Sequence, residues 1–142
     1  MGLLDGKRLL ITGVLTEASL GYGVARLAQQ EGADIVLTGV GNGMKHTLKT
    51  AKKLPAEPDV LEFDVLEPAH VESVRTELQQ RWGRVDGALH SIGFAPSVCL
   101  GGTFMEAGWG DVAVAMNASA FSLKTLADVV APLMTGGGSI VG

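Results

Sequence analysis

Cysteine is almost absent from this sequence, because Cys99 stands alone among 142 residues and no disulfide can form within the chain. Long apolar runs are absent too, since none approaches the roughly 18 residues needed to cross a bilayer. Asp5, Lys7 and Arg8 interrupt the apolar residues at the start, where a signal peptide needs an unbroken run. These shortages favour a cytoplasmic protein that does not span or enter a membrane.

Charge is also scarce, with 18% charged residues and a net charge of −4. A protein that binds nucleic acid or an anionic membrane needs a basic face, so we expect neither partner. The chain is 46% hydrophobic, which excludes disorder, and its length suits one domain with a real core. His46, His70 and His90 lack the paired spacing of metal ligands, and Cys99 has no evident activating partner. We expect no metal site.

Short apolar runs alternate with helical patterns along the whole chain. Strands are predicted at residues 8–12, 34–38, 60–63, 85–91 and 139–141, and helices from residue 19 and over 44–54, 68–82 and 111–130. This alternation predicts right-handed parallel crossovers and an α/β, doubly wound, Rossmann-like sheet. The expected order of its five strands is 3-2-1-4-5, within a single domain over residues 1–142.

Apolar spacing predicts which side of each helix is buried. In the first helix the expected buried positions are Leu20, Val24, Leu27 and Ala28, with Gly32 as the C-terminal stop. In the helix that starts at Pro68, the expected buried stripe is Val71, Val74, Leu78 and Trp82.

In doubly wound sheets, ligands bind beyond the carboxyl ends of the strands. After the first strand, Gly13 leaves space for a pyrophosphate, and the helix that follows directs unpaired N–H groups toward the same place. Ser19 can cap that helix or donate its hydroxyl to a phosphate. The alternative is an ordinary strand-to-helix turn with a cap, because an isolated glycine pattern is weak evidence.

Two further loops lie at the same predicted edge. Asp64 directly follows the third strand and can accept a hydrogen bond from an adenine amino group, with Val65 against the ring; as an alternative, Asp is a common turn residue. After the fourth strand, the small backbone of Ser91, Ile92 and Gly93 would lie beside a ribose and nicotinamide, or would simply end a strand. Because all three loops share one edge, a dinucleotide site is favoured.

The loop after the second strand bears on the choice of cofactor. An NADP site usually offers Arg or Lys there to the 2′-phosphate. Here the loop is Gly-Val-Gly-Asn-Gly over residues 39–43, with no cation until Lys45, and it also lacks the acidic residue that commonly binds the NAD ribose. NADH is favoured, mainly because a phosphate clamp is missing.

Several segments carry a family resemblance, in order and at family spacing: GLLDGKRLLITG, GADIVLTG, LEFDV, DGALHSIGF, SAFS and GGSIVG. The chain resembles the NADH-dependent enoyl-acyl carrier protein reductases of the short-chain dehydrogenase/reductase superfamily, with the mycobacterial long-chain type looking closest. The resemblance implies an oxidoreductase of fatty acid biosynthesis and lipid metabolism. It would transfer hydride to a trans-2-enoyl thioester on acyl carrier protein or coenzyme A, and its full-length form would be a homo-oligomer.

The resemblance also implies roles for individual residues. The implied cofactor-binding residues are Gly13 and Leu15 in the pyrophosphate loop, Ser19 and Leu20 at the phosphates, Val40 over the adenosine, Asp64 and Val65 at the adenine, Ser91, Ile92 and Gly93 at the ribose and nicotinamide, and Ala118 in the long helix. Relatives of this type carry an aromatic residue in place of Val40 and a larger aliphatic one in place of Ala118, which implies looser adenosine packing. Phe94 and Leu100 are weaker candidates for the acyl-chain entrance, since exposed apolar loop residues are common.

The resemblance further implies that a tyrosine and a lysine beyond the fifth strand perform catalysis. Tyr22 is the only tyrosine, and we expect it to be a packing residue of the first helix. We therefore expect this chain to be an N-terminal, dinucleotide-binding portion without catalytic residues, inactive alone. Asn117 either corresponds to an asparagine that supports catalysis in the superfamily or is a polar helix residue. Two alternatives remain open, a catalytically dead NAD-binding module and another short-chain dehydrogenase such as a ketoacyl reductase.

Overall fold

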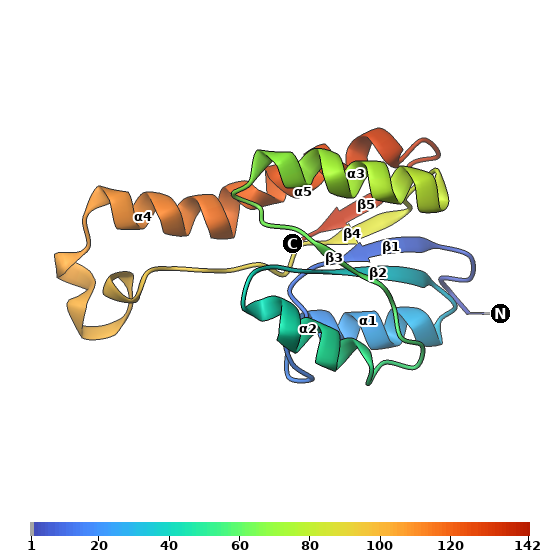
Figure 1. The fold of residues 1–142 in the computed structure, drawn as a ribbon, viewed down its shortest axis with the longest axis horizontal. Coiled ribbons are helices and arrows are strands. Elements are labelled where there is room, and N and C mark those ends of the chain that lie inside the picture. Colours follow the sequence, from blue (N-terminus) through green and yellow to red (C-terminus); the bar gives the residue numbers. More distant parts are fainter. Residues whose placement is uncertain (1) are drawn as a thin grey trace.

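The computed structural model describes residues 2–142, and within them one parallel sheet has five strands in the order β3-β2-β1-β4-β5 (Figure 1). The strands are β1 (Arg8–Ile11), β2 (Asp34–Gly39), β3 (Val60–Glu62), β4 (Gly87–Leu89) and β5 (Ser139–Val141). Every adjacent pair is parallel. The predicted order and the doubly wound architecture are confirmed. The fourth strand is shorter than the predicted 85–91.

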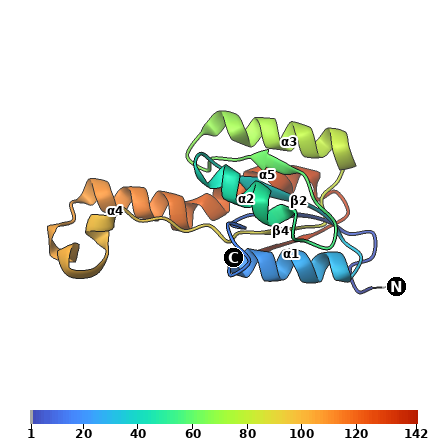
Figure 2. The same ribbon diagram turned by 60° about the horizontal axis from the view of Figure 1, so that its bottom comes forward.

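Helices cover both faces of the sheet (Figures 1 and 2). On one face lie α1 (Leu20–Gln30) and α2 (Gly43–Ala51), and on the other α3 (Pro68–Trp82) and α5 (Ser122–Val130). Successive residues of β1 serve opposite faces, since Leu10 joins the core under α3 and α5 while Ile11 joins the core under α1 and α2. None of the helices among the described residues is long and apolar enough to span a membrane.

Helix α1 does not bury the side that was predicted. Leu20 is 84% exposed and Leu27 57%, whereas the buried residues are Gly21, Tyr22, Ala25 and Ala28. The helix lies so close to the sheet that a Cβ on Gly21 would be 2.8 Å from the carbonyl oxygen of Thr12. Apart from Tyr22, the residues that face the sheet are therefore small, and the larger aliphatic ones face away. The predicted spacing was right, but the predicted face was wrong except at Ala28.

Other helix signals in the sequence are confirmed. Gly32 ends α1 with φ of 92°, and its N–H donates to the carbonyl of Gln29 at 3.0 Å, while the N–H of Ala33 donates to Ala28 at 2.9 Å. In α3 the central stripe residues Val74 and Leu78 are buried. The outer stripe residues, Val71 and Trp82, are partly buried against the same core.

The single helix predicted over 111–130 is three consecutive segments. It begins earlier, as α4 (Trp109–Met116), passes through one π-helical turn, η3 (Asn117–Phe121), and continues as α5. Before α4 the chain runs outward through two 3-10 turns, η1 (Ser97–Cys99) and η2 (Gly101–Glu106), and a further turn, η4 (Ala131–Leu133), follows α5. We call residues 95–116 the arm, which projects from the sheet in Figure 1. None of the residues in η1, η2 or α4 is buried.

Candidate functional site

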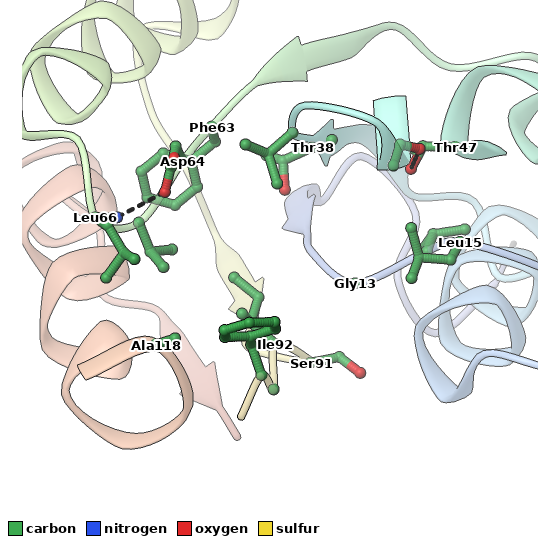
Figure 3. A pocket seen from close by; sticks show the side chains of 17 residues that line it. Gly13, Leu15, Thr38, Thr47, Phe63, Asp64, Leu66, Ser91, Ile92 and Ala118 are labelled. Carbon is green, nitrogen blue, oxygen red and sulfur yellow. Dashed lines mark hydrogen bonds between the residues drawn. The ribbon is translucent and has the colours of Figure 1, made fainter. Parts of the chain in front are cut away.

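A cavity of about 370 Å³ lies at the carboxyl ends of the strands (Figure 3). The loops that follow β1, β2, β3 and β4 all contribute to its lining, and η3 closes one side. Parallel strands bring these loops together because their carboxyl ends meet at one edge of the sheet. The three loops that sequence reasoning assigned to one edge are indeed neighbours.

The loops after β1 and β4 touch through backbone atoms. Gly13 has φ of 75°, and a Cβ on it would lie 1.8 Å from the carbonyl oxygen of Ser91. The hydroxyl of Thr12 donates to the carbonyl of Leu89 at 2.8 Å and accepts from the N–H of Ser91 at 3.0 Å. The sequence interpretation explained Gly13 by space for a pyrophosphate. The structure adds a stricter reason, because only glycine permits this contact between the two loops.

Ser19 is the N-cap residue of α1, and its hydroxyl organises the loop that precedes the helix. Its hydroxyl oxygen accepts from the N–H groups of Leu15 at 3.1 Å and Thr16 at 3.0 Å, and makes no capping bond to the helix. Of the two possibilities that the sequence left open for this hydroxyl, a capping bond to the helix is not formed, since the loop amides occupy the oxygen. Within the described residues, the N–H groups of Leu20 and Gly21 have no hydrogen-bond partner. These free donors and the helix dipole make the start of α1 suitable for an anion.

Asp64 has one carboxylate oxygen committed and one free. Its Oδ1 accepts from the N–H of Leu66 at 2.9 Å, drawn as the dashed line in Figure 3. Its own N–H donates to Nδ1 of His70 at 2.9 Å. Oδ2 has no hydrogen-bond partner among residues 2–142, and of the residues that line the cavity Asp64 is the only charged one. The cavity thus offers one hydrogen-bond-accepting anion next to apolar walls.

The loop after β4 is fastened to the π-helical turn by two serines. The hydroxyl of Ser119 accepts from the N–H of Phe94 at 2.9 Å and donates to its carbonyl at 2.8 Å. The hydroxyl of Ser122 donates to the carbonyl of Ala118 at 2.6 Å, so it accepts from Nε2 of His90, 2.7 Å away. These bonds hold Ala118 at the cavity wall. π-Helical turns are common at functional sites.

His90 is buried, and its burial lowers the pKa of the imidazole. The neutral ring donates through Nε2, as the Ser122 bond requires. His90 is thus a buried, hydrogen-bonded histidine at the edge of the site. Tyr22 is likewise a packing residue, buried in the core with its hydroxyl bonded to the carbonyl of Lys53 at 3.0 Å.

Most of the predicted site residues line the cavity. They are Gly13, Leu15, Val40, Asp64, Val65, Ser91, Ile92, Gly93, Ala118 and the weaker candidate Phe94. Three do not line it: Ser19 and Leu20 lie at the start of α1, and Leu100 lies on the arm with 60% exposure. Whether these residues bind a ligand stays a prediction.

Seven lining residues were not among the predicted binding residues, although Val14, Gly39 and Gly43 lie in loops that the sequence had indicated: Val14, Thr38, Gly39, Gly43, Thr47, Phe63 and Leu66. Most of them adjoin predicted residues at strand ends, so extending each predicted loop by one position would have found them. Gly43 and Thr47 lie one turn apart on α2, and their i, i+4 spacing was the available signal. Lys45, the first cation after β2, is exposed and does not line the cavity.

Comparison with known proteins agrees with this geometry. The family model described as enoyl-(acyl carrier protein) reductase matches residues 13–142. The chain is 39% identical to the enoyl-[acyl-carrier-protein] reductase [NADH] of Mycolicibacterium smegmatis, covering 99% of this chain and 54% of that protein. It is 35% identical to the enzyme of the same name from Mycobacterium avium (99% and 53%) and 32% identical to Escherichia coli FabI (99% and 54%). The chain spans about half the length of these curated relatives.

The family match covers all four loops of the cavity and the π-helical turn that closes it. Gly13, where the two loops touch, is the first residue matched, and the match continues through β5. The chain therefore belongs to the enoyl-(acyl carrier protein) reductase family.

Proposed function

We propose that this chain binds NADH in the cavity and is the dinucleotide-binding part of an NADH-dependent enoyl-acyl carrier protein reductase of fatty acid synthesis. The observation that carries the proposal is the cavity itself, in which the loops after four parallel strands surround one free carboxylate oxygen and apolar walls. Several relatives are named as NADH enzymes.

The adenine would lie between the loops after β2 and β3. Asp64 Oδ2 is the free acceptor for an exocyclic amino group, and Val65 and Val40 supply apolar surface on either side. The 2′-phosphate of NADPH would find no partner, because no cation lines this part of the cavity among the residues described. The loop over residues 39–43, which follows β2, also carries no cation. These features support NADH over NADPH.

The pyrophosphate would lie over the start of α1. The unpartnered N–H groups of Leu20 and Gly21 are donors suited to its oxygens, and the hydroxyl hydrogen of Ser19 is a third, since its oxygen only accepts within the loop. At Leu20 the contact would be with the backbone N–H and not with the side chain, which is 84% exposed.

The nicotinamide would lie toward Ser91–Gly93 and Ala118. Hydride for an enoyl thioester, on acyl carrier protein or coenzyme A, is the chemistry that bound NADH supplies. Phe94 lines the cavity at this end and suits an acyl chain; Leu100 does not line the cavity and is the weaker candidate. Enolate formation needs a hydrogen-bond donor beside the carbonyl, and no tyrosine or lysine is among the residues that line the cavity.

We therefore propose that residues 1–142 form the cofactor-binding part of a single short-chain dehydrogenase/reductase domain in a cytoplasmic, homo-oligomeric enzyme. The catalytic tyrosine and lysine would come from the remainder of that domain. The greater length of the relatives supports this reading. The same missing donors favour one second candidate, a catalytically dead NAD-binding module.

Titration of the purified chain with NADH and NADPH, followed by ligand fluorescence, tests the proposal. We expect saturable NADH binding, at least about tenfold weaker NADPH binding, and no NADH oxidation with an enoyl thioester. The C-terminal half of a relative, expressed separately and added to the chain, distinguishes the two candidates. We expect NADH oxidation to appear if the chain is part of a reductase and to remain absent if it is a catalytically dead module. Absence of NADH binding, or a preference for NADPH, would contradict the cofactor assignment.

A further inference from the structure

His70 contacts the candidate site without lining it. It lies in the first turn of α3 and is half-buried, and its Nδ1 accepts the N–H of Asp64 at 2.9 Å. Because Nδ1 is an acceptor here, the ring proton lies on Nε2. A neutral imidazole therefore holds the backbone of the residue that carries the free carboxylate oxygen of the cavity.

The loop between β3 and α3 is also held where it begins, because Phe63 is buried and its N–H donates to the carbonyl of Gly39 in β2 at 2.9 Å. The remaining bonds at Asp64 are local. The N–H of Glu67 donates to the carbonyl of Asp64 at 3.0 Å, and the N–H of Leu66 donates to its Oδ1 at 2.9 Å. Both bonds lie within the loop and would move with it. The His70 bond ties the loop to the body of α3, whose Val74 and Leu78 are packed in the core.

We propose that His70 is a positioning residue for the adenine end of the dinucleotide, in that its Nδ1 fixes the place at which Asp64 offers Oδ2. The inference rests on the proposed NADH site. Without an acceptor at this point the N–H of Asp64 loses its partner, and the loop moves to satisfy it with water. A displacement of about 1 Å in the Asp64 carboxylate would be enough to weaken its hydrogen bond to the adenine.

The acceptor atom, rather than the bulk of the ring, is the feature required. Asparagine can place its Oδ1 where the imidazole holds Nδ1, because both atoms are one bond beyond Cγ. Glutamine places its oxygen one bond further out, and leucine offers no acceptor. A role in packing alone would make leucine the best replacement and asparagine a poor one.

The test measures NADH affinity for the wild-type chain and for His70→Asn, His70→Gln and His70→Leu, with His46→Leu as the control. His46 is an exposed histidine of α2 that does not line the cavity. We expect affinity to fall about fivefold to tenfold in H70L and H70Q and to stay within about twofold in H70N and H46L. Thermal melts identify any variant that fails to fold; if H70L fails, the comparison of H70N with H70Q decides.

A double-mutant cycle with Asp64→Ala then tests whether His70 acts through Asp64. In the D64A background we expect H70L to cost less than about twofold in affinity, since the carboxylate it positions is gone. Additive losses, an unchanged H70L, or failure of H70N to retain affinity would overturn the inference while leaving NADH binding by the wild type intact. Absence of wild-type NADH binding would overturn the proposed function, and this inference with it.

Discussion

Apolar side chains are buried in the sheet and its helices but exposed in the arm, residues 95–116. In the sheet, Leu10 is 0% exposed and Ile11 1%, whereas in the arm Met105 is 90% exposed and Trp109 77%. The sheet therefore has its own core on each face. The arm packs few of its apolar side chains and is joined to the sheet at its two ends (Figure 1).

The sheet region and the arm should therefore contribute differently to NADH binding. The cavity lies within the sheet region and meets the arm only near its ends, where Ser119 binds Phe94 and where Ala118 lies at the cavity wall. Changes inside the sheet should alter folding and NADH binding together. Changes at the outer end of the arm should alter neither.

The largest expected effect comes from one methyl group added in the sheet region. Gly13→Ala places a Cβ 1.8 Å from the Ser91 carbonyl at a φ of 75° that alanine rarely adopts. We expect a loss of about 3 kcal/mol or more in the free energy of unfolding, and no measurable NADH binding. Urea denaturation and NADH titration measure both.

The matched control is Gly102→Ala in the arm, where an added Cβ meets no atom within 4 Å. We expect its stability to change by less than about 0.5 kcal/mol. Equal effects of the two substitutions would show that Gly13 does not hold the β1 and β4 loops together.

The next effect concerns binding rather than folding. In Asp64→Asn, the amide can keep the Leu66 bond through its oxygen and turns an NH₂ group toward the adenine amino group, so two donors would face each other. We expect NADH affinity to fall by about 1–3 kcal/mol with little loss of stability. Asp111→Asn, whose side chain caps α4 at Gly108, is the control in the arm and should bind NADH normally. Normal binding by D64N would contradict the adenine assignment.

Sequence reasoning succeeded in the sheet region for physical reasons. The strand order follows from the alternation of strands and helices and from the handedness of the crossovers. The cavity loops follow the strand ends, so the sequence alone was enough to predict that Gly13, Asp64 and Ile92 lie at one edge of the sheet. It failed on the buried face of α1, because close packing at Gly21 reverses the usual preference for large apolar residues. Periodicity cannot report the distance between a helix and a sheet.

The helix that follows the arm shows a different limit. The pattern over 111–130 predicts a helix but gives no sign of the π-helical turn, where Ser119 and Ser122 form hydrogen bonds with residues distant in sequence. The bond from His70 to Asp64 was missed in the same way. The residue types were visible, but which atoms meet is decided by tertiary packing.

A smaller effect is expected where the sheet joins the arm, at His90. Burial lowers the pKa of His90, so the unfolded chain takes up this proton at a higher pH than the folded chain does. The corresponding stability is fully present above the unfolded pKa of about 6.5 and is lost as pH falls toward the folded pKa. We expect the free energy of unfolding to fall between pH 7 and pH 5.

His90→Gln sharpens this prediction, because its side-chain amide can still donate to Ser122 but does not titrate. The difference in unfolding free energy between wild type and H90Q should change with pH in the acid range and be constant above pH 7. A difference that is independent of pH would show that His90 is not held neutral by the fold.

The smallest expected effect is at the outer end of the arm. Phe104, Met105 and Trp109 are 62%, 90% and 77% exposed, so replacing all three with serine removes few native contacts. We expect each of the three substitutions to change the free energy of unfolding by less than about 0.5 kcal/mol. The NADH affinity of the triple variant should stay within about twofold of wild type. Leu78→Ala, at a position with 0% exposure in the sheet core, is the reference and should cost about 2–5 kcal/mol. Exposed apolar patches promote association, so light scattering should show less self-association in the triple variant. A loss of stability comparable to that of L78A would mean that the arm is packed in solution, and the contrast between the two regions would no longer hold.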